Sequence, residues 1–213
     1  MHLDTAHNAS MMTQMTSLHE ARLDHVYRQL KATGARTVLD LGCGSGALLY
    51  RLAVDDQFER IVGLEASGLS LRQARLDLAQ WMEPGDDRVR LVPGSYTEAQ
   101  PQLAGFDAAA MVETIEHVKP EHIGLVEKKV FAHMRPGSVY VTTPNREYNP
   151  LYGLAPGAFR EADHKFEWDR DRFRKWATGV ARRNGYTVRI GGMGEADIEF
   201  GHPTQTALFQ RRD

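Results

Sequence analysis

The sequence predicts a single α/β domain, built on a mostly parallel seven-stranded sheet with helices on both faces. Strand and helix patterns alternate along most of the chain, an order that gives parallel strands joined by right-handed crossovers. A glycine-rich loop joins the first strand to the helix that follows it. A chain of 213 residues is long enough for one such domain with a substantial core, and too short for two of comfortable size.

Seven apolar runs have the length and the bounds of strands. They are residues 37–41, 60–64, 89–92, 106–112, 138–143, 186–190 and 206–209. One helix is expected from about Ser17 to Gly34, and a second directly after the glycine loop. Three more are expected over about 69–81, 120–134 and 169–184. Residues 1–16 show little periodicity and predict a mobile arm before a single domain of residues 17–213. Residues 146–163 predict a long active-site loop or lid.

The composition is that of an ordinary globular protein, with 25% charged and 42% hydrophobic residues. A net charge of −2 provides no global attraction to nucleic acid or to a membrane, so a polyanion would need a local patch. No apolar run approaches the length of a membrane span, and no membrane partner is expected. The single cysteine, Cys43, has no partner within the chain, which favours a reducing cytoplasmic location.

Polar side chains follow five of the predicted strands. Asp40, Glu65, Ser95, Glu113 and Asn145 each stand at or just beyond the carboxyl end of a strand. Ligands in parallel sheets bind beyond these ends, so the five are expected to gather at one edge of the sheet.

The loop Asp40-Leu41-Gly42-Cys43-Gly44-Ser45-Gly46 has the glycines that a close ligand approach requires. Its third glycine comes one residue too early for the loop that holds a dinucleotide pyrophosphate, which favours S-adenosylmethionine. Glu65 ends the next strand, where a carboxylate can accept both ribose hydroxyls, and Ser95 is a candidate for contact with the adenine. The alternative is a plain glycine turn, although Asp40 before the loop and Glu65 after it favour the cofactor.

Glu113, Glu116 and His117 are spaced i, i+3 and i+4, so on a helical turn they share one face. Carboxylate and imidazole donors together suit Mg²⁺, Mn²⁺ or Co²⁺ better than Ca²⁺. His164 is a possible fourth donor. The alternatives are acidic charge that complements a helix dipole and, for His164, an ordinary surface histidine.

Four segments together resemble the Hen1 family of RNA 3′-terminal 2′-O-methyltransferases. The segments are residues 38–44, the run Val112-Glu113-Thr114-Ile115-Glu116-His117, the run Thr142-Thr143-Pro144-Asn145-Arg146-Glu147-Tyr148-Asn149, and the run Asp163-His164-Lys165-Phe166-Glu167-Trp168. The tail of residues 201–207 fits more weakly. The glycine loop is shared by many methyltransferases, whereas the other three motifs are specific. The resemblance implies the Rossmann-like fold of class I S-adenosylmethionine-dependent methyltransferases.

The resemblance also implies functional residues. Glu113, Glu116, His117 and His164 would bind the catalytic Mg²⁺ or Mn²⁺. The cofactor would be held by Glu65 and Ser95 with the glycines Gly42 and Gly44, with further contacts from Asp40 and from Arg22, near the methionine carboxylate. Glu65 stands where the family usually has aspartate. The resemblance covers the methyltransferase module alone, and does not extend to the RNA-binding domains of plant relatives or to the ligase-activating N-terminal half of many bacterial relatives.

The implied reaction is methylation of the 2′-hydroxyl of an RNA whose 3′ end carries a free 2′,3′-diol. RNA-repair proteins are possible partners by resemblance. Arg146 and Lys165, inside the motifs, are candidates for RNA contact, and Tyr148, Phe166 and Trp168 could stack on bases or pack in the core. Two other functions stay open: O-methylation of a small vicinal diol such as a catechol, and a non-catalytic module that binds RNA 3′ ends. A dehydrogenase is disfavoured by the early third glycine.

Overall fold

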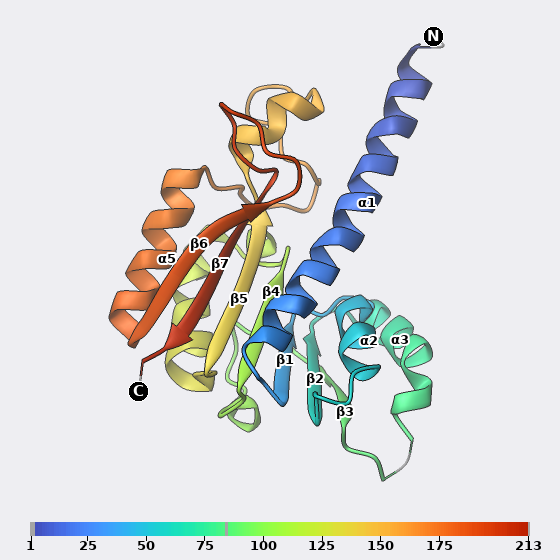
Figure 1. Cartoon of the computed structure of the whole chain (residues 1–213), viewed down its shortest axis with the longest axis vertical. Coiled ribbons are helices and arrows are strands. Elements are labelled where there is room, and N and C mark those ends of the chain that lie inside the picture. The colour runs from blue at the N-terminus through green and yellow to red at the C-terminus, as the bar shows by residue number, and fades with distance from the viewer. Residues whose placement is uncertain (1–2, 84, 213) are drawn as a thin grey trace.

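The computed structural model describes residues 3–83 and 85–212, with only the course of the backbone for residues 3–16. Its centre is a seven-stranded sheet in the order β3-β2-β1-β4-β5-β7-β6 (Figure 1). Strands β1 to β5 are parallel, and β7 runs antiparallel to both of its neighbours. The strands are β1 (Thr37–Leu41), β2 (Arg60–Glu65), β3 (Val89–Pro93), β4 (Ala108–Val112), β5 (Ser138–Pro144), β6 (Tyr186–Met193) and β7 (Thr204–Arg211). The predicted fold class is therefore confirmed.

Helices cover both faces of the sheet. The α-helices of at least seven residues are α1 (Leu3–Ala32), α2 (Ala47–Ala53), α3 (Gly68–Asp77) and α5 (Arg170–Asn184). Helix α1 begins at Leu3 instead of near Ser17, so the prediction of its start was wrong; the mobility of residues 1–16 stays a prediction. The helix expected over 120–134 is three consecutive pieces, namely η4 (Pro120–His122), α4 (Ile123–Val126) and the π-helix η5 (Glu127–Met134).

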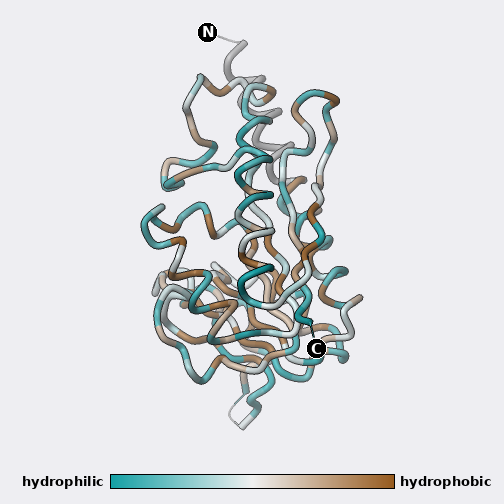
Figure 2. Tube along the Cα trace, turned by 90° about the vertical axis from the view of Figure 1, so that its left-hand side faces the viewer, coloured by the Kyte–Doolittle hydropathy of each residue, from teal (hydrophilic) through white to brown (hydrophobic). Residues whose placement is uncertain are grey.

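The sheet separates two hydrophobic cores. One contains Leu39 and Leu41 together with Phe131 and Phe173, from the side covered by η5 and α5. The other contains Val38 and packs against α1, α2 and α3. This alternation within β1 reflects the two-residue period of a strand, and both faces are apolar because both are covered. In Figure 2 many hydrophobic segments lie in the lower body of the molecule, and the loops above it alternate between hydrophilic and hydrophobic stretches.

The strand register gathers the predicted functional segments at one edge. Asp40 pairs with Gly63 in β2 and with Ala110 in β4, and Glu65 pairs with Pro93 at the end of β3. The loop after β1 and the turn after β4 therefore leave the sheet side by side. In Figure 1, α1 and the segment after β5 extend beyond this upper edge. Within the described residues, no helix is both long enough and apolar enough to cross a membrane.

The predicted loop over 146–163 opens with a 3₁₀-helix, η6 (Arg146–Tyr152), capped by Asn145, whose side chain accepts the Glu147 N–H. The Arg146 N–H donates to the Trp168 carbonyl, which ties the start of the loop to the chain beyond its end. The loop is thus anchored at both ends over the edge of the sheet where the polar residues gather.

Candidate active site

A cavity of about 720 Å³ lies at the glycine loop. Four of the six predicted cofactor residues line it: Gly42, Gly44, Glu65 and Ser95. Its wall also includes Ser67, Ser70, Tyr96 and Thr97, which sequence reasoning did not single out. These residues follow β2 and β3, so only the folded edge brings them to the glycine loop.

The carboxylate of Glu65 braces the loops around this cavity. One oxygen accepts the Gly44 N–H at 3.0 Å, and the other accepts the Ser67 N–H at 2.7 Å. The Ser67 hydroxyl in turn accepts the Ser70 N–H and caps α3. Glu65 therefore holds the glycine loop and the start of α3 at a fixed separation, which leaves the cavity preformed.

Asp40 is almost wholly buried beside this cavity and does not line it. Burial, with a smaller contribution from the charge of Glu65, raises the pKa of Asp40 from 3.8 to about 7. Its predicted contact with the cofactor stays a prediction.

The raised pKa of Asp40 predicts how stability depends on pH. In the unfolded chain the group ionises near pH 4, whereas in the folded protein it keeps its proton to about pH 7. The contribution of protonated Asp40 to the free energy of unfolding is therefore complete below its pKa in the unfolded chain. This contribution is lost as the pH rises to its pKa in the folded protein. We expect Asp40→Asn to gain stability relative to the wild type between pH 4 and 7, by a few kcal/mol in order of magnitude. Urea unfolding of both proteins at pH 5 and 7.5 measures this; an identical pH dependence would contradict it.

The glycine loop is in close contact with the turn after β4. Gly42 has a φ of +84°, and a Cβ at this position would lie 2.3 Å from the Thr114 hydroxyl oxygen. The Tyr96 hydroxyl donates to the Thr114 carbonyl at 3.0 Å. The turn that carries Glu113 and Glu116 is thus held between the glycine loop and the loop after β3.

A second cavity, of about 370 Å³, adjoins the same turn. Glu113 and His117 line both cavities. The second cavity is further lined by Leu18, His19, Arg22, Pro144, Tyr152, Arg160, Glu161 and His164. Arg22 thus lies in the wall of this second cavity, where its guanidinium is 3.3 Å from Glu113 and 3.2 Å from Thr204. Its predicted contact with the methionine carboxylate stays a prediction.

Three of the four predicted metal ligands come together, and two of them, His117 and His164, line the second cavity. Glu116, His117 and His164 each offer a donor atom within 4.8 Å of the others. The rings of His117 and His164 lie 4.9 Å apart between centroids, although the two residues are distant in sequence. Glu113 is outside this group: it precedes the 3₁₀ turn Ile115–His117, has a φ of +47° and pairs with Arg22. Its role as a ligand stays a prediction.

Unpaired polar atoms mark the same place. In the described part of the chain, four buried side-chain polar atoms have no hydrogen-bond partner, and three of them belong to Arg22, Glu113 and Glu116. Burial, followed by the charge of Glu113, raises the pKa of Glu116 well above its ordinary value of 4.5. Leaving buried polar atoms unsatisfied is costly, and a bound cation would satisfy the carboxylate oxygens. The residues present therefore fit a divalent metal.

Each member of the group has a partner behind it. The Thr143 hydroxyl donates to Glu116 at 3.0 Å. Nδ1 of His164 lies 2.7 Å from Glu167, and Nδ1 of His117 lies 3.1 Å from Asp163. Carboxylates behind ligand histidines are typical of metal sites. Sequence reasoning had not assigned these three partners a role, although all three belong to segments that resemble the family.

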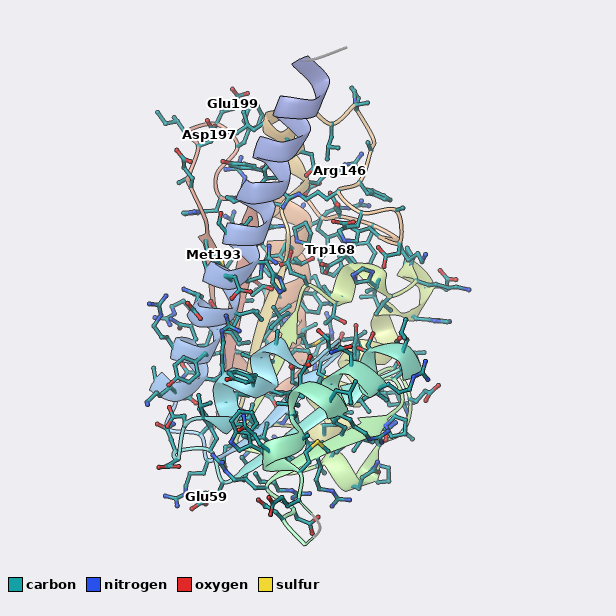
Figure 3. The ribbon with its side chains drawn as sticks, turned by 90° about the vertical axis from the view of Figure 1, so that its right-hand side faces the viewer. Glu59, Arg146, Trp168, Met193, Asp197 and Glu199 are labelled. Carbon is teal, nitrogen blue, oxygen red and sulfur yellow. The ribbon has the colours of Figure 1, made fainter. Side chains whose placement is uncertain are left out.

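The candidate RNA contacts differ in exposure. Arg146 and Lys165 are exposed, and Figure 3 shows Arg146 at the opposite end of the molecule from Glu59, which precedes β2. Tyr148 is only 9% exposed, with its ring 5.4 Å from that of Tyr152. Phe166 and Trp168 pack against each other and Trp168 against Trp176. These contacts favour the packing interpretation for the three aromatic residues and leave the two cations as candidates.

Comparison with known proteins agrees with this geometry. A family model described as a methyltransferase domain matches residues 38–137. The solved methyltransferase domain of bacterial CtHen1 is 40% identical, with a TM-score of 0.82, over 92% of this chain and 100% of that one. The small RNA 2′-O-methyltransferase of Xenopus tropicalis is 36% identical over 203 residues, 91% of this chain and 55% of that protein. The chain thus spans about half the length of the curated relatives it matches.

The sheet order, the glycine loop and the cavity beside it define the class of protein: a Rossmann-like S-adenosylmethionine-dependent methyltransferase. Within that class, identity above 30% over the whole of a solved relative places the chain more narrowly. It belongs to the Hen1 family of methyltransferase domains.

Proposed function

We propose that this protein is a metal-dependent methyltransferase that methylates the 2′-hydroxyl of the 3′-terminal nucleotide of RNA. The observation that supports this most is the arrangement of two cavities around one turn: Glu113 and His117 line both, and the three-donor group includes His117 and His164, which line the smaller one. Such a turn can separate a methyl donor in one cavity from a methyl acceptor in the other, with one metal beside both. The small RNA 2′-O-methyltransferases among its relatives favour RNA as the acceptor.

The larger cavity is the proposed site of S-adenosylmethionine, whose sulfonium supplies the methyl group. Glu65, at the end of β2, lines this cavity and would accept the ribose hydroxyls. The glycine loop lets the backbone approach the ligand closely at Gly42 and Gly44. Ser95 and Tyr96 supply the wall after β3, where we place the adenine.

Glu116, His117 and His164, joined by Glu113, would hold Mg²⁺ or Mn²⁺. Such an ion lowers the pKa of a bound hydroxyl and orients it. The protein's own part is to fix the donors before substrate arrives: the buried side chains of Thr143 and Glu167 contact Glu116 and His164. Arg22 holds Glu113 at the boundary between the cavities.

The smaller cavity is the proposed site of the terminal nucleotide. Its cations Arg22 and Arg160 suit a phosphate, and Tyr152 and Pro144 give apolar wall for a sugar or base. Exposed Arg146 and Lys165 extend the positive charge outside. A terminal 2′,3′-diol offers two adjacent oxygens for the metal, so we expect an RNA with a free 3′ end to be the substrate.

Transfer of labelled methyl from S-adenosylmethionine tests this function. With Mn²⁺ present, RNA ending in a 2′,3′-diol should be labelled, and nuclease digestion should recover the label on the 2′-oxygen of the last nucleotide. The same RNA with a 3′-phosphate or a 3′-deoxy end should be labelled far less. Equal labelling of all three ends, or preferential labelling of a catechol, would contradict the proposal.

Two further expectations accompany this function. A cytoplasmic location is expected because the one cysteine, Cys43, is free and buried. RNA-repair partners stay a prediction: the structure described as the Pnkp1/Rnl/Hen1 RNA repair complex is 20% identical and shows a shared fold alone.

A further inference from the structure

Glu167 is a buried carboxylate with three hydrogen-bond donors around it. One oxygen lies 2.7 Å from Nδ1 of His164 and accepts the Arg160 N–H at 2.7 Å. The other accepts the Asn149 side-chain amide at 2.5 Å. The Glu167 side chain is 0% exposed, so no solvent competes for these bonds.

The donors around Glu167 are themselves anchored. The Arg160 side chain donates to the Asn149 side-chain oxygen at 2.8 Å and to the Asn145 carbonyl at 2.7 Å. Asn145 follows β5, and its amide donates to the Phe200 and His202 carbonyls. The network thus connects Glu167 to the end of β5, so the sheet holds the Glu167 carboxylate in place.

The other histidine of the group has a different support. Nδ1 of His117 lies 3.1 Å from Asp163, whose side chain is 72% exposed. Water can replace such a contact at little cost, because exposed ion pairs contribute little. The two histidines can therefore be compared within one protein: His164 has a buried carboxylate partner, and His117 has an exposed one.

We propose that Glu167 is a positioning residue that holds His164 in the tautomer with the proton on Nδ1. The Nδ1–H then donates to Glu167, and Nε2 keeps the lone pair that a metal requires. Asn149 and Arg160 fix the carboxylate, and through it the orientation of the ring. This inference rests on the metal site of the proposed function and assigns Glu167 a role that the ligands alone do not explain.

Two variants of Glu167 separate an acceptor role from simple packing. Glu167→Met keeps the approximate length and removes both acceptors, whereas Glu167→Gln keeps one oxygen that can still accept from His164. Asp163→Asn is the matched control at the exposed partner. Long-range ¹H–¹⁵N spectra of the metal-free proteins report the tautomer of His164, and Mn²⁺ titration followed by electron paramagnetic resonance reports affinity.

In the wild type we expect one His164 tautomer, protonated at Nδ1. Glu167→Met should show mixed tautomers and bind Mn²⁺ roughly 10- to 100-fold more weakly, the usual effect of losing a partner behind a ligand. Glu167→Gln should be intermediate, and Asp163→Asn should stay within about threefold of the wild type. Should Glu167→Met fail to fold, the Glu167→Gln spectrum and affinity decide the question.

The inference is overturned if a folded Glu167 variant keeps the wild-type tautomer and Mn²⁺ affinity. It is also overturned if Asp163→Asn weakens binding as much as Glu167→Met does. His164→Ala distinguishes this failure from failure of the proposed metal site. If His164→Ala binds Mn²⁺ weakly while the Glu167 variants bind normally, only the role of Glu167 is wrong; if His164→Ala also binds normally, the metal site itself is misplaced.

Discussion

Glu116→Gln is expected to abolish methyl transfer while leaving the affinity for S-adenosylhomocysteine nearly intact. Glu116 is fully buried in the three-donor group and does not line the cofactor cavity, so its loss should remove the metal without disturbing the cofactor. Metal stabilisation of a transition state is worth several kcal/mol, which corresponds to a rate lower by on the order of 10³-fold. Single-turnover methyl transfer and calorimetric binding of S-adenosylhomocysteine measure the two effects.

The same variant should fold at least as well as the wild type in the absence of metal. Burial raises the pKa of Glu116, so a neutral amide resembles the protonated carboxyl that the metal-free fold favours. Activity and stability should therefore change independently, as expected for a residue kept for function. Weak binding of S-adenosylhomocysteine by Glu116→Gln would mean that this acid serves the cofactor instead.

Gly42→Ala is expected to disrupt the cofactor site. The backbone there has a φ of +84°, which costs a residue with a Cβ about 1–3 kcal/mol. The new methyl would also lie 2.3 Å from the Thr114 hydroxyl oxygen, so the glycine loop or the turn after β4 must move. Since every 1.4 kcal/mol is about a tenfold change in binding, we expect affinity for S-adenosylhomocysteine to fall by at least about tenfold.

Gly34→Ala is the matched control for this substitution. Its backbone also has positive φ, +75°, yet a Cβ there would meet nothing within 4 Å, and Gly34 lines neither cavity of the site. Its effect should be limited to backbone strain, and its effect on affinity for S-adenosylhomocysteine should be smaller than that of Gly42→Ala. Adding Thr114→Ala to Gly42→Ala removes the hydroxyl and should restore part of the binding. Equal losses for both glycines, with no recovery in the double variant, would contradict a role for contact with Thr114.

The sheet and its functional edge could be predicted from the sequence because both follow from local patterns. Alternating strands and helices dictate parallel connections, and parallel connections bring Glu65 and Glu113 to one edge. The bounds of β6 and β7 were underestimated, at 186–190 and 206–209, since their ends extend beyond the apolar runs. The start of α1 was missed because the residues before Ser17 have little helical periodicity, the pattern used to predict helices.

The details of the site depend on distances between residues far apart in the chain, and the spacing of residues along the sequence does not predict these distances. His164 lies on a segment without periodicity, and it reaches Glu116 through backbone bonds such as that from the Lys165 N–H to the Glu116 carbonyl, at 2.8 Å. The sequence also did not indicate that the packing of α1 brings Arg22 to 3.3 Å from Glu113, in the wall of the second cavity. Thr143 contacts Glu116 only because β5 ends beside the turn after β4.

The most direct test of the metal site is a crystal structure with Mn²⁺ and S-adenosylhomocysteine, read from anomalous scattering at the manganese edge. We predict a single strong peak within bonding distance of Glu116, His117 and His164, with the unpaired oxygen of Glu113 completing the carboxylate pair. A peak bound elsewhere, or no peak at this group at a Mn²⁺ concentration that supports full activity, would contradict the account.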